Sequence, residues 1–216
     1  MAKSPLVDAM DGLQAQLDPW LRESGFRKHG RTYNRETLEG LAHVISFQMG
    51  SFDPPGTTYI PGLRENLYGR FAVNIGIYVP EVAQHHGGGK PKKVIHEYNC
   101  CIRSRLGHSD KIVWWTVSRS EALAHEICRL LETEALPLFR QFERRDQILA
   151  EFGNQADNTD LIAVPRIVCA LILFEQGKRE EAQRLLTLQA RDHTRNPGHP
   201  AYVVGLARKL GIDISI

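Results

Sequence analysis

The sequence predicts an α+β fold: an antiparallel sheet of about five strands with helices packed on one face, followed by a C-terminal helical subdomain. Between Gly69 and Val79 the apolar residues occupy every second position, which is the period of a strand with one buried face. On either side of the strand-rich region, apolar residues recur at steps of three and four, which is the period of an amphipathic helix. We therefore expect neighbouring antiparallel strands with the rest of the chain packed around them.

The first element is a helix that begins at Ser4-Pro5 and ends at Gly25. Serine caps a helix well, and proline fits the first turn, where its missing N–H costs nothing. One apolar stripe then runs along the predicted helix through Leu6, Met10, Leu13, Leu17, Trp20 and Leu21. Asp18-Pro19 should kink or restart this helix.

Strands fill the middle of the chain. We expect a first strand over Phe26–Arg35 and a second over Leu41–Met49, joined by a hairpin around Glu36–Gly40. After the strand in Gly69–Val79, a second alternation places Tyr98, Cys100, Ile102 and Leu106 on one side, and Glu97, Asn99, Cys101, Arg103 and Arg105 on the other. A last strand carries Trp114 and Trp115, which must point to opposite faces.

Helices make up the rest of the chain. Ser118 and Glu121 have the spacing of a capping box, and an apolar stripe follows until Pro137, which should break or kink the helix. A polar stretch between Asn154 and Asp160 divides the predicted sheet domain, residues 1–153, from a helical appendage, residues 160–216. The appendage contains three predicted helices, and the first two resemble one tetratricopeptide hairpin: Pro165–Gln176, Arg179–Arg191 and Pro200–Leu210.

Composition excludes several classes of protein. The chain has 27 basic and 25 acidic residues, a net charge of +2, which argues against a dedicated nucleic-acid-binding protein. Four cysteines among 216 residues are too few for a disulfide scaffold, and reduced thiols fit the cytoplasm. Acidic residues at helical spacing in the first 25 positions argue against a signal peptide, and no apolar run is long enough to span a membrane. We expect a cytoplasmic protein with no membrane contact.

Short motifs follow one another in the order Gly25-Phe26-Arg27-Lys28, Phe47-Gln48, Phe71-Ala72-Val73-Asn74-Ile75-Gly76, Arg103-Ser104-Arg105-Leu106-Gly107 and Trp114-Trp115. From about Leu6 to Leu136 this order resembles the bacterial family catalogued as domain of unknown function 4304. The C-terminal helices lie outside the resemblance. The resemblance implies no activity and no catalytic residue, and small families of this kind often occur in toxin-immunity loci.

The polar face of the predicted sheet is the candidate binding surface. Its site residues are Gln48, Asn74, Asn99, Arg103, Arg105, Trp114 and Trp115. Two arginines that converge with amide side chains suit the recognition of a carboxylate or a phosphate, and one of the two tryptophans should line the same face. The competing interpretation is an ordinary solvated sheet face.

The sequence assigns no catalytic residue, no metal site and no cofactor. The motifs of serine hydrolases, zinc proteases and dinucleotide-binding proteins are absent. Histidines 85, 86 and 96 with Cys100 match no standard zinc spacing. A Cys101 nucleophile with His43 or His96 as its base is conceivable, but a buried, inert cysteine is the favoured interpretation.

Together these observations predict a non-catalytic protein-interaction module, of immunity or adaptor type, whose partner is another protein. The alternative is a small-anion-binding protein or an enzyme that uses the polar sheet face. A deep pocket around the two arginines would favour the alternative, and a flat or convex face would favour the interaction module.

Overall fold

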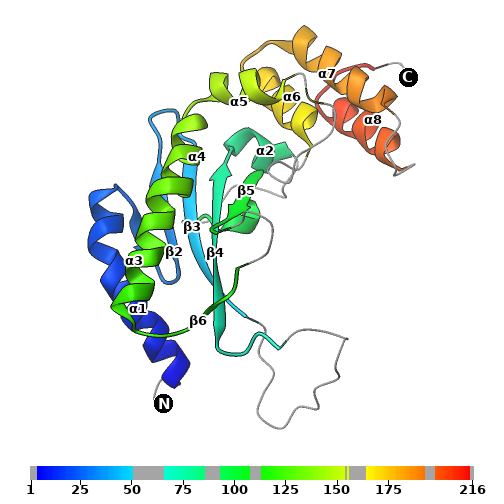
Figure 1. Cartoon of the computed structure of the whole chain (residues 1–216). Helices are drawn as coiled ribbons and strands as arrows, with labels where there is room; N and C mark the ends of the chain where they lie inside the picture. The colour runs from blue at the N-terminus through cyan, green and yellow to red at the C-terminus, as the bar shows by residue number, and fades with distance from the viewer. Residues whose placement is uncertain are drawn as a thin grey trace.

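The computed structural model describes residues 4–50, 66–85, 93–107, 113–153, 155, 164–192 and 198–214. Figure 1 shows an open sheet with helix α1 (Pro5–Glu23) and helix α3 (Glu121–Leu130) along one face, and the C-terminal helices at one end of the sheet. The predicted α+β class is confirmed. We call the face covered by α1 and α3 the core face, and the opposite one the far face.

The sheet is antiparallel throughout, and β4 is its central strand. The hydrogen-bonded order is β1-β2-β3-β4-β5, and β6 pairs with β4 further along the same edge as β5. The strands are β1 (Arg27–His29), β2 (Thr32–Glu36), β3 (Ala42–Met49), β4 (Arg70–Tyr78), β5 (Ile102–Arg105) and β6 (Trp115–Thr116). The predicted alternation of β4 is confirmed, because Phe71, Val73, Ile75 and Ile77 are all buried in the main core.

The segment expected to form one strand over Phe26–Arg35 is instead a tight hairpin. Strand β1 turns back onto β2 so that His29 lies opposite Thr32. Gly30, in the turn, has φ of 64°, a left-handed conformation that glycine adopts without steric cost. The predicted hairpin, between β2 and β3, is present where it was expected, with Glu36 opposite Ala42.

The predicted strand over residues 97–106 was too long. Glu97–Asn99 form a 3₁₀ turn, η1, and strand pairing begins only at Ile102. Because the turn interrupts the alternation, Cys100 lies on the far face while Cys101 lies in the main core, and Tyr98 is 65% exposed. Cys100 fits there because its side chain occupies the space that a Cβ on Gly76 would fill.

Helix α3 starts two residues later than the capping box predicted, with Ser120 at the N-cap position. The chain does not break at Pro137. A π-helical turn, η2 (Leu131–Ala135), leads directly into helix α4 (Leu136–Gln141), and Pro137 lies in the first turn of α4. Proline has no N–H to donate, and its ring crowds the preceding turn. The wider backbone of the π turn makes room for Pro137.

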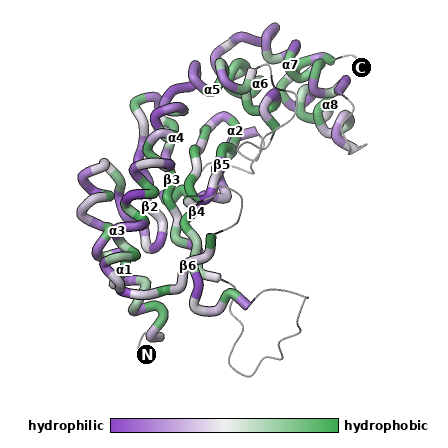
Figure 2. Tube along the Cα trace, viewed as in Figure 1, coloured by the Kyte–Doolittle hydropathy of each residue, from purple (hydrophilic) through white to green (hydrophobic). Residues whose placement is uncertain are grey.

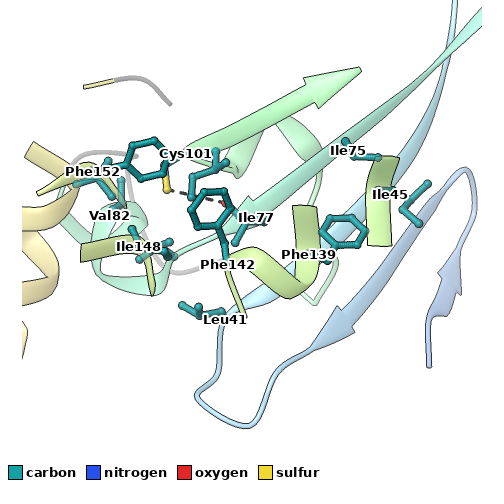
Figure 3. Packing of buried hydrophobic residues seen from close by; sticks show 14 of the residues in the cluster. Leu41, Ile45, Ile75, Ile77, Val82, Cys101, Phe139, Phe142, Ile148 and Phe152 are labelled. Atoms are coloured by element: carbon teal, nitrogen blue, oxygen red, sulfur yellow. Dashed lines mark hydrogen bonds between the residues drawn. The ribbon is translucent and has the colours of Figure 1, made fainter. Parts of the chain in front are cut away.

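The main core continues from the sheet into the C-terminal helices. Figure 3 shows Phe142 next to Ile77 of β4 and Cys101, with Ile148 and Phe152 to the left of them. The same cluster then includes the buried side of the remaining helices: α5 (Arg145–Phe152), α6 (Pro165–Glu175), α7 (Arg179–Arg191) and α8 (His199–Lys209). Helix α2 (Pro80–His85) packs against α6. Figure 2 shows that β4 and α6 are among the most hydrophobic segments.

The three predicted C-terminal helices are present with nearly the expected bounds. The predicted boundary between a sheet domain and a helical appendage falls at 154–160, where only residue 155 is among the described residues. The division into two domains, 1–153 and 160–216, therefore stays a prediction.

The central position of β4 leads to a stability prediction. Ile75→Asp should unfold the protein, because a carboxylate would have to enter a site that is 2% exposed, at a cost of several kcal/mol. The matched control is Leu38→Asp, at a fully exposed position in the β2–β3 hairpin, whose effect should stay within about 0.5 kcal/mol. Urea denaturation measures both variants. Equal midpoints for Ile75→Asp and the unmodified protein would contradict the strand assignment.

Candidate binding site

Residues 93–100 cross the far face of the sheet, and we call this segment the strap. The side-chain amide of Asn34 on β2 holds the strap by two hydrogen bonds to one residue. Its Nδ2 donates to the carbonyl of Ile95 at 2.7 Å, and its Oδ1 accepts from the N–H of Ile95 at 3.0 Å. Further along, Thr32 contacts His96 Nδ1 at 3.3 Å. The strap thereby divides the far face into two parts.

On the β5 side of the strap is a hollow of about 330 Å³, which we call the β5 hollow. Its lining residues are Gln48, Asn74, Ile75, Glu97, Arg103, Ser104 and Arg105. The sheet register explains why they meet. Asn74 lies directly opposite Ser46 on β3 and Arg105 on β5, so three adjacent strands present their side chains at the same level.

Arg105 is held in place by neutral groups. Its Nε donates to Asn74 Oδ1 at 2.8 Å, and its Nη2 donates to Gln48 Oε1 at 3.2 Å. Asn74 Nδ2 also donates to Gln48 Oε1 at 2.8 Å, which fixes both amides. The guanidinium carbon lies 5.1 Å from the centre of the Trp114 ring, within the range of a cation–π contact.

Among the described residues, neither Arg105 nor Arg103 forms an ion pair, so both keep their charge unneutralised. Burial lowers the pKa of Arg105, and the nearby charge of Glu97 opposes that shift. Arg103 is exposed at the rim. The described lining of the hollow therefore contains two arginines and one carboxylate.

The structure separates the two tryptophans. Trp114 is half-buried beside Arg105, whereas Trp115 is buried in the main core, 5.7 Å from the ring of Phe71, and donates its Nε1 hydrogen to Glu126 at 3.1 Å. Trp115 faces the core because it pairs with Phe71, whose side chain lies on the core face. Trp115 therefore lies outside the candidate site.

Asn99 also lies outside the β5 hollow. Its Oδ1 accepts the backbone N–H of His96 and so stabilises the η1 turn. Sequence reasoning placed Glu97 on this face but left it out of the site, and it missed Ser104. The alternation assigned Ser104 to the core side of β5, and no signal in the sequence indicates that a half-buried serine lines the hollow.

Among the described residues, neither His43 nor His96 forms a hydrogen bond with the hypothetical cysteine nucleophile. Burial raises the pKa of Cys101 to about 12, and its thiol donates to the carbonyl of Ile77 at 3.9 Å. His43 is fully buried on the core face, where its ring stacks on Phe139 and its Nδ1 lies 3.1 Å from Arg35 Nη2. Because a guanidinium only donates, Nδ1 is the acceptor and Nε2 carries the proton of the neutral ring.

Within the described ranges, no three His, Cys, Asp or Glu side chains are grouped closely enough to hold a metal ion. Two of the histidines considered for such a site have other partners: His85 contacts Glu175 at 2.6 Å, and His96 stacks on Tyr98. The third, at position 86, lies outside the described residues. Of the helices in the described part of the chain, none has both the length and the apolar character to cross a membrane.

The comparisons with known proteins gave one match. The family described as "Domain of unknown function (DUF4304)" matches residues 63–141, which confirms the resemblance over that segment. The match is shorter than the resemblance expected from about Leu6. It includes β4, β5 and β6 with Asn74, Arg105 and Trp114, but not Gln48 on β3. Neither the curated proteins nor the solved structures contained a match.

The buried His43 predicts that stability depends on pH. Burial first, and the charge of Arg35 second, lower its pKa from 6.5 to about 4. The folded protein favours the neutral form of the His43 ring. The contribution of this ring to the free energy of unfolding is therefore fully present above pH 6.5 and is lost as the pH falls from 6.5 towards 4. The loss should reach roughly 3 kcal/mol.

The measurement is urea denaturation between pH 7 and pH 4. His43→Phe should reduce the loss of stability over this pH range. His125→Gln, at an exposed position of α3, should lose stability as the unmodified protein does. A decline that is as steep in His43→Phe as in the unmodified protein would contradict the assignment to His43.

The Asn34 contact predicts how the strap is held. Asn34→Ala removes both hydrogen bonds to Ile95 and should lower stability by about 1–3 kcal/mol. Hydrogen exchange at the Ile95 amide should become faster. Asn66→Ala is the control, because in the described part of the chain that side chain makes only a local contact, accepting the N–H of Tyr68. Unchanged exchange at Ile95 in Asn34→Ala would show that other contacts hold the strap.

Proposed function

We propose that this chain is a non-catalytic protein-interaction module, of adaptor or immunity type, that binds an acidic side chain of another protein at the β5 hollow. The observation that carries the proposal is the environment of Arg105, which two neutral amide oxygens and one aromatic ring hold in place without a carboxylate among the described residues.

This environment orients the charge without neutralising it. A guanidinium has five N–H donors, and the contacts with Asn74 and Gln48 use two of them. The remaining donors are available to a carboxylate, which a planar guanidinium binds well through paired hydrogen bonds. Because the amides and Trp114 already fix the Arg105 side chain, this side chain loses less conformational entropy when a partner binds.

The shape of the site supports a protein partner. The β5 hollow is open, and half-buried Trp114 lies beside Arg105. Tryptophan, tyrosine and arginine are the residues that most often dominate the energy of protein–protein contacts. The weak net charge of +2 favours a protein partner over a nucleic acid.

We infer a cytoplasmic location in a bacterium. The four cysteines are free, and three of them are buried without forming a disulfide, which suits a reducing compartment. The family resemblance supports a bacterial source.

A small anion is the second candidate ligand. A volume of about 330 Å³ is at the lower limit for a small-molecule pocket, and the unneutralised arginines would attract an anion equally well. The interaction module and the small-anion-binding protein predict different results in the same experiment.

The experiment is affinity purification of the tagged chain from its native host, followed by titration of the purified partner against variants. Arg105→Ala and Trp114→Ala should each weaken binding by about tenfold or more, which is the effect of a contact worth at least 1.4 kcal/mol. Arg105→Lys should retain part of the affinity, because the charge stays but the paired geometry is lost. Arg129→Ala, an exposed arginine on α3, is the control and should bind normally.

A partner that binds Arg105→Ala as tightly as the unmodified chain would contradict the proposal. Saturable binding of citrate or phosphate that is lost in Arg105→Ala, with no protein retained, would support the second candidate.

A further inference from the structure

A second, larger hollow lies on the other side of the strap, and we call it the β1 hollow. Its volume is about 640 Å³, twice that of the β5 hollow. Its lining residues are Gly25, Arg27, His29, Asn34, Arg35, Glu36, Gly40, Ala42, Tyr78, Pro80, Gln84, Lys93 and Ile95. Neither the proposed function nor the family match assigns a role to it.

Strand β1 directs basic side chains to this hollow. Lys28 points to the core face, where its Nζ donates to both carboxylate oxygens of Asp18 on α1. Because successive side chains on a strand alternate, Arg27 and His29 point to the far face. No ion pair neutralises either of them among the described residues.

The strap adds a third basic group from the opposite wall. Lys93 begins the strap, is exposed, and lines the same hollow. Glu36 is the one acidic residue in the lining, so basic groups outnumber acidic ones there. Basic side chains that converge from two separate elements raise the local concentration of anions.

The floor of the hollow contains a polar group without a partner. Tyr78 on β4 lines the hollow and is 2% exposed, and its buried hydroxyl makes no hydrogen bond to the described part of the chain. A buried hydroxyl without a partner costs about 1–3 kcal/mol. A ligand that supplies an acceptor to this hydroxyl would recover part of that free energy.

We propose that the β1 hollow binds a small organic anion that carries phosphate or several carboxylate groups. Arg27, His29 and Lys93 contact the acidic oxygens, and the Tyr78 hydroxyl donates to an oxygen at the floor. Ala42, Pro80 and Ile95 supply an apolar surface for the carbon skeleton. The volume lies within the 300–1,000 Å³ range of small-molecule sites.

This site is independent of the proposed function. The strap separates the two hollows, and none of the residues named in the proposal lines the β5 hollow. Loss of partner binding in Arg105→Ala and loss of anion binding in an Arg27 variant are therefore separate results.

The test is isothermal titration of the full chain with citrate, inorganic phosphate and glucose 6-phosphate at low ionic strength. We expect at least one probe to bind saturably, and the affinity to fall with added salt. Arg27→Ala with Lys93→Ala should weaken binding by tenfold or more. Arg129→Ala, at an exposed position of α3 outside both hollows, is the matched control and should leave the affinity within twofold.

Tyr78→Phe separates a binding role from a structural one. Removing an unpartnered hydroxyl should leave the midpoint of urea unfolding unchanged or raise it, because no hydrogen bond is lost in the free protein. The same variant should weaken probe binding several-fold. Its retained stability shows that the loss does not come from misfolding.

Three results would overturn the proposal. One is the absence of saturable binding for all three probes. Another is binding that the Arg27 and Lys93 double variant leaves unchanged, and the third is binding that Arg103→Ala abolishes, which would move the anion site to the β5 hollow.

Discussion

The pairing of β3 with β4 is the interaction on which the rest of the structure depends. Strand β4 has neighbours on both edges, and its alternation sends Ile75 into the core and Asn74 to the far face. A shift of one residue in this register would exchange the two faces along the whole strand. The main core and the position of Arg105 are therefore set by the same ladder of hydrogen bonds.

Neutral partners position both Arg105 and Arg35. Arg105 is held by amide oxygens and Trp114, whereas Arg35 donates to the carbonyl of Ser24 and to His43 and stacks between Phe26 and Phe139. Burial lowers the pKa of both guanidinium groups. The planar, weakly hydrated guanidinium tolerates such surroundings better than an ammonium group would. The two sites differ in their surroundings, since Arg35 packs on two phenylalanines of the core and also lines the β1 hollow, whereas Arg105 lies beside Trp114 and lines the β5 hollow.

Local periodicity was enough to predict β3, β4 and the three C-terminal helices, because each of these elements buries one regular stripe of its own residues. It failed where a contact between distant segments decides the structure. The strap is fixed by Asn34 and Ile95, which are 61 positions apart, and no local pattern encodes that contact. The apparent alternation around Cys100 and Cys101 was misleading, because a 3₁₀ turn and a close approach to Gly76 place Cys100 on the far face and Cys101 in the core, which is the reverse of the predicted faces.

The candidate site shows the same limit. The sequence indicated a polar face that includes Gln48, Asn74 and Arg105, and hydrogen bonds join these three side chains in the structure. It left open which tryptophan faces the core, since that depends on how β6 pairs with β4. It included Asn99, whose side chain instead stabilises a turn.

The way the strap is fastened has a consequence for how this surface can evolve. The side chain of Asn34 forms hydrogen bonds with the main chain of Ile95, and every amino acid except proline has the same N–H and carbonyl groups. Side chains of the strap can therefore be exchanged while its course over the sheet stays the same. Lys93 lines one hollow and Glu97 the other, so substitutions along one short segment can change the lining of both hollows without a new fold.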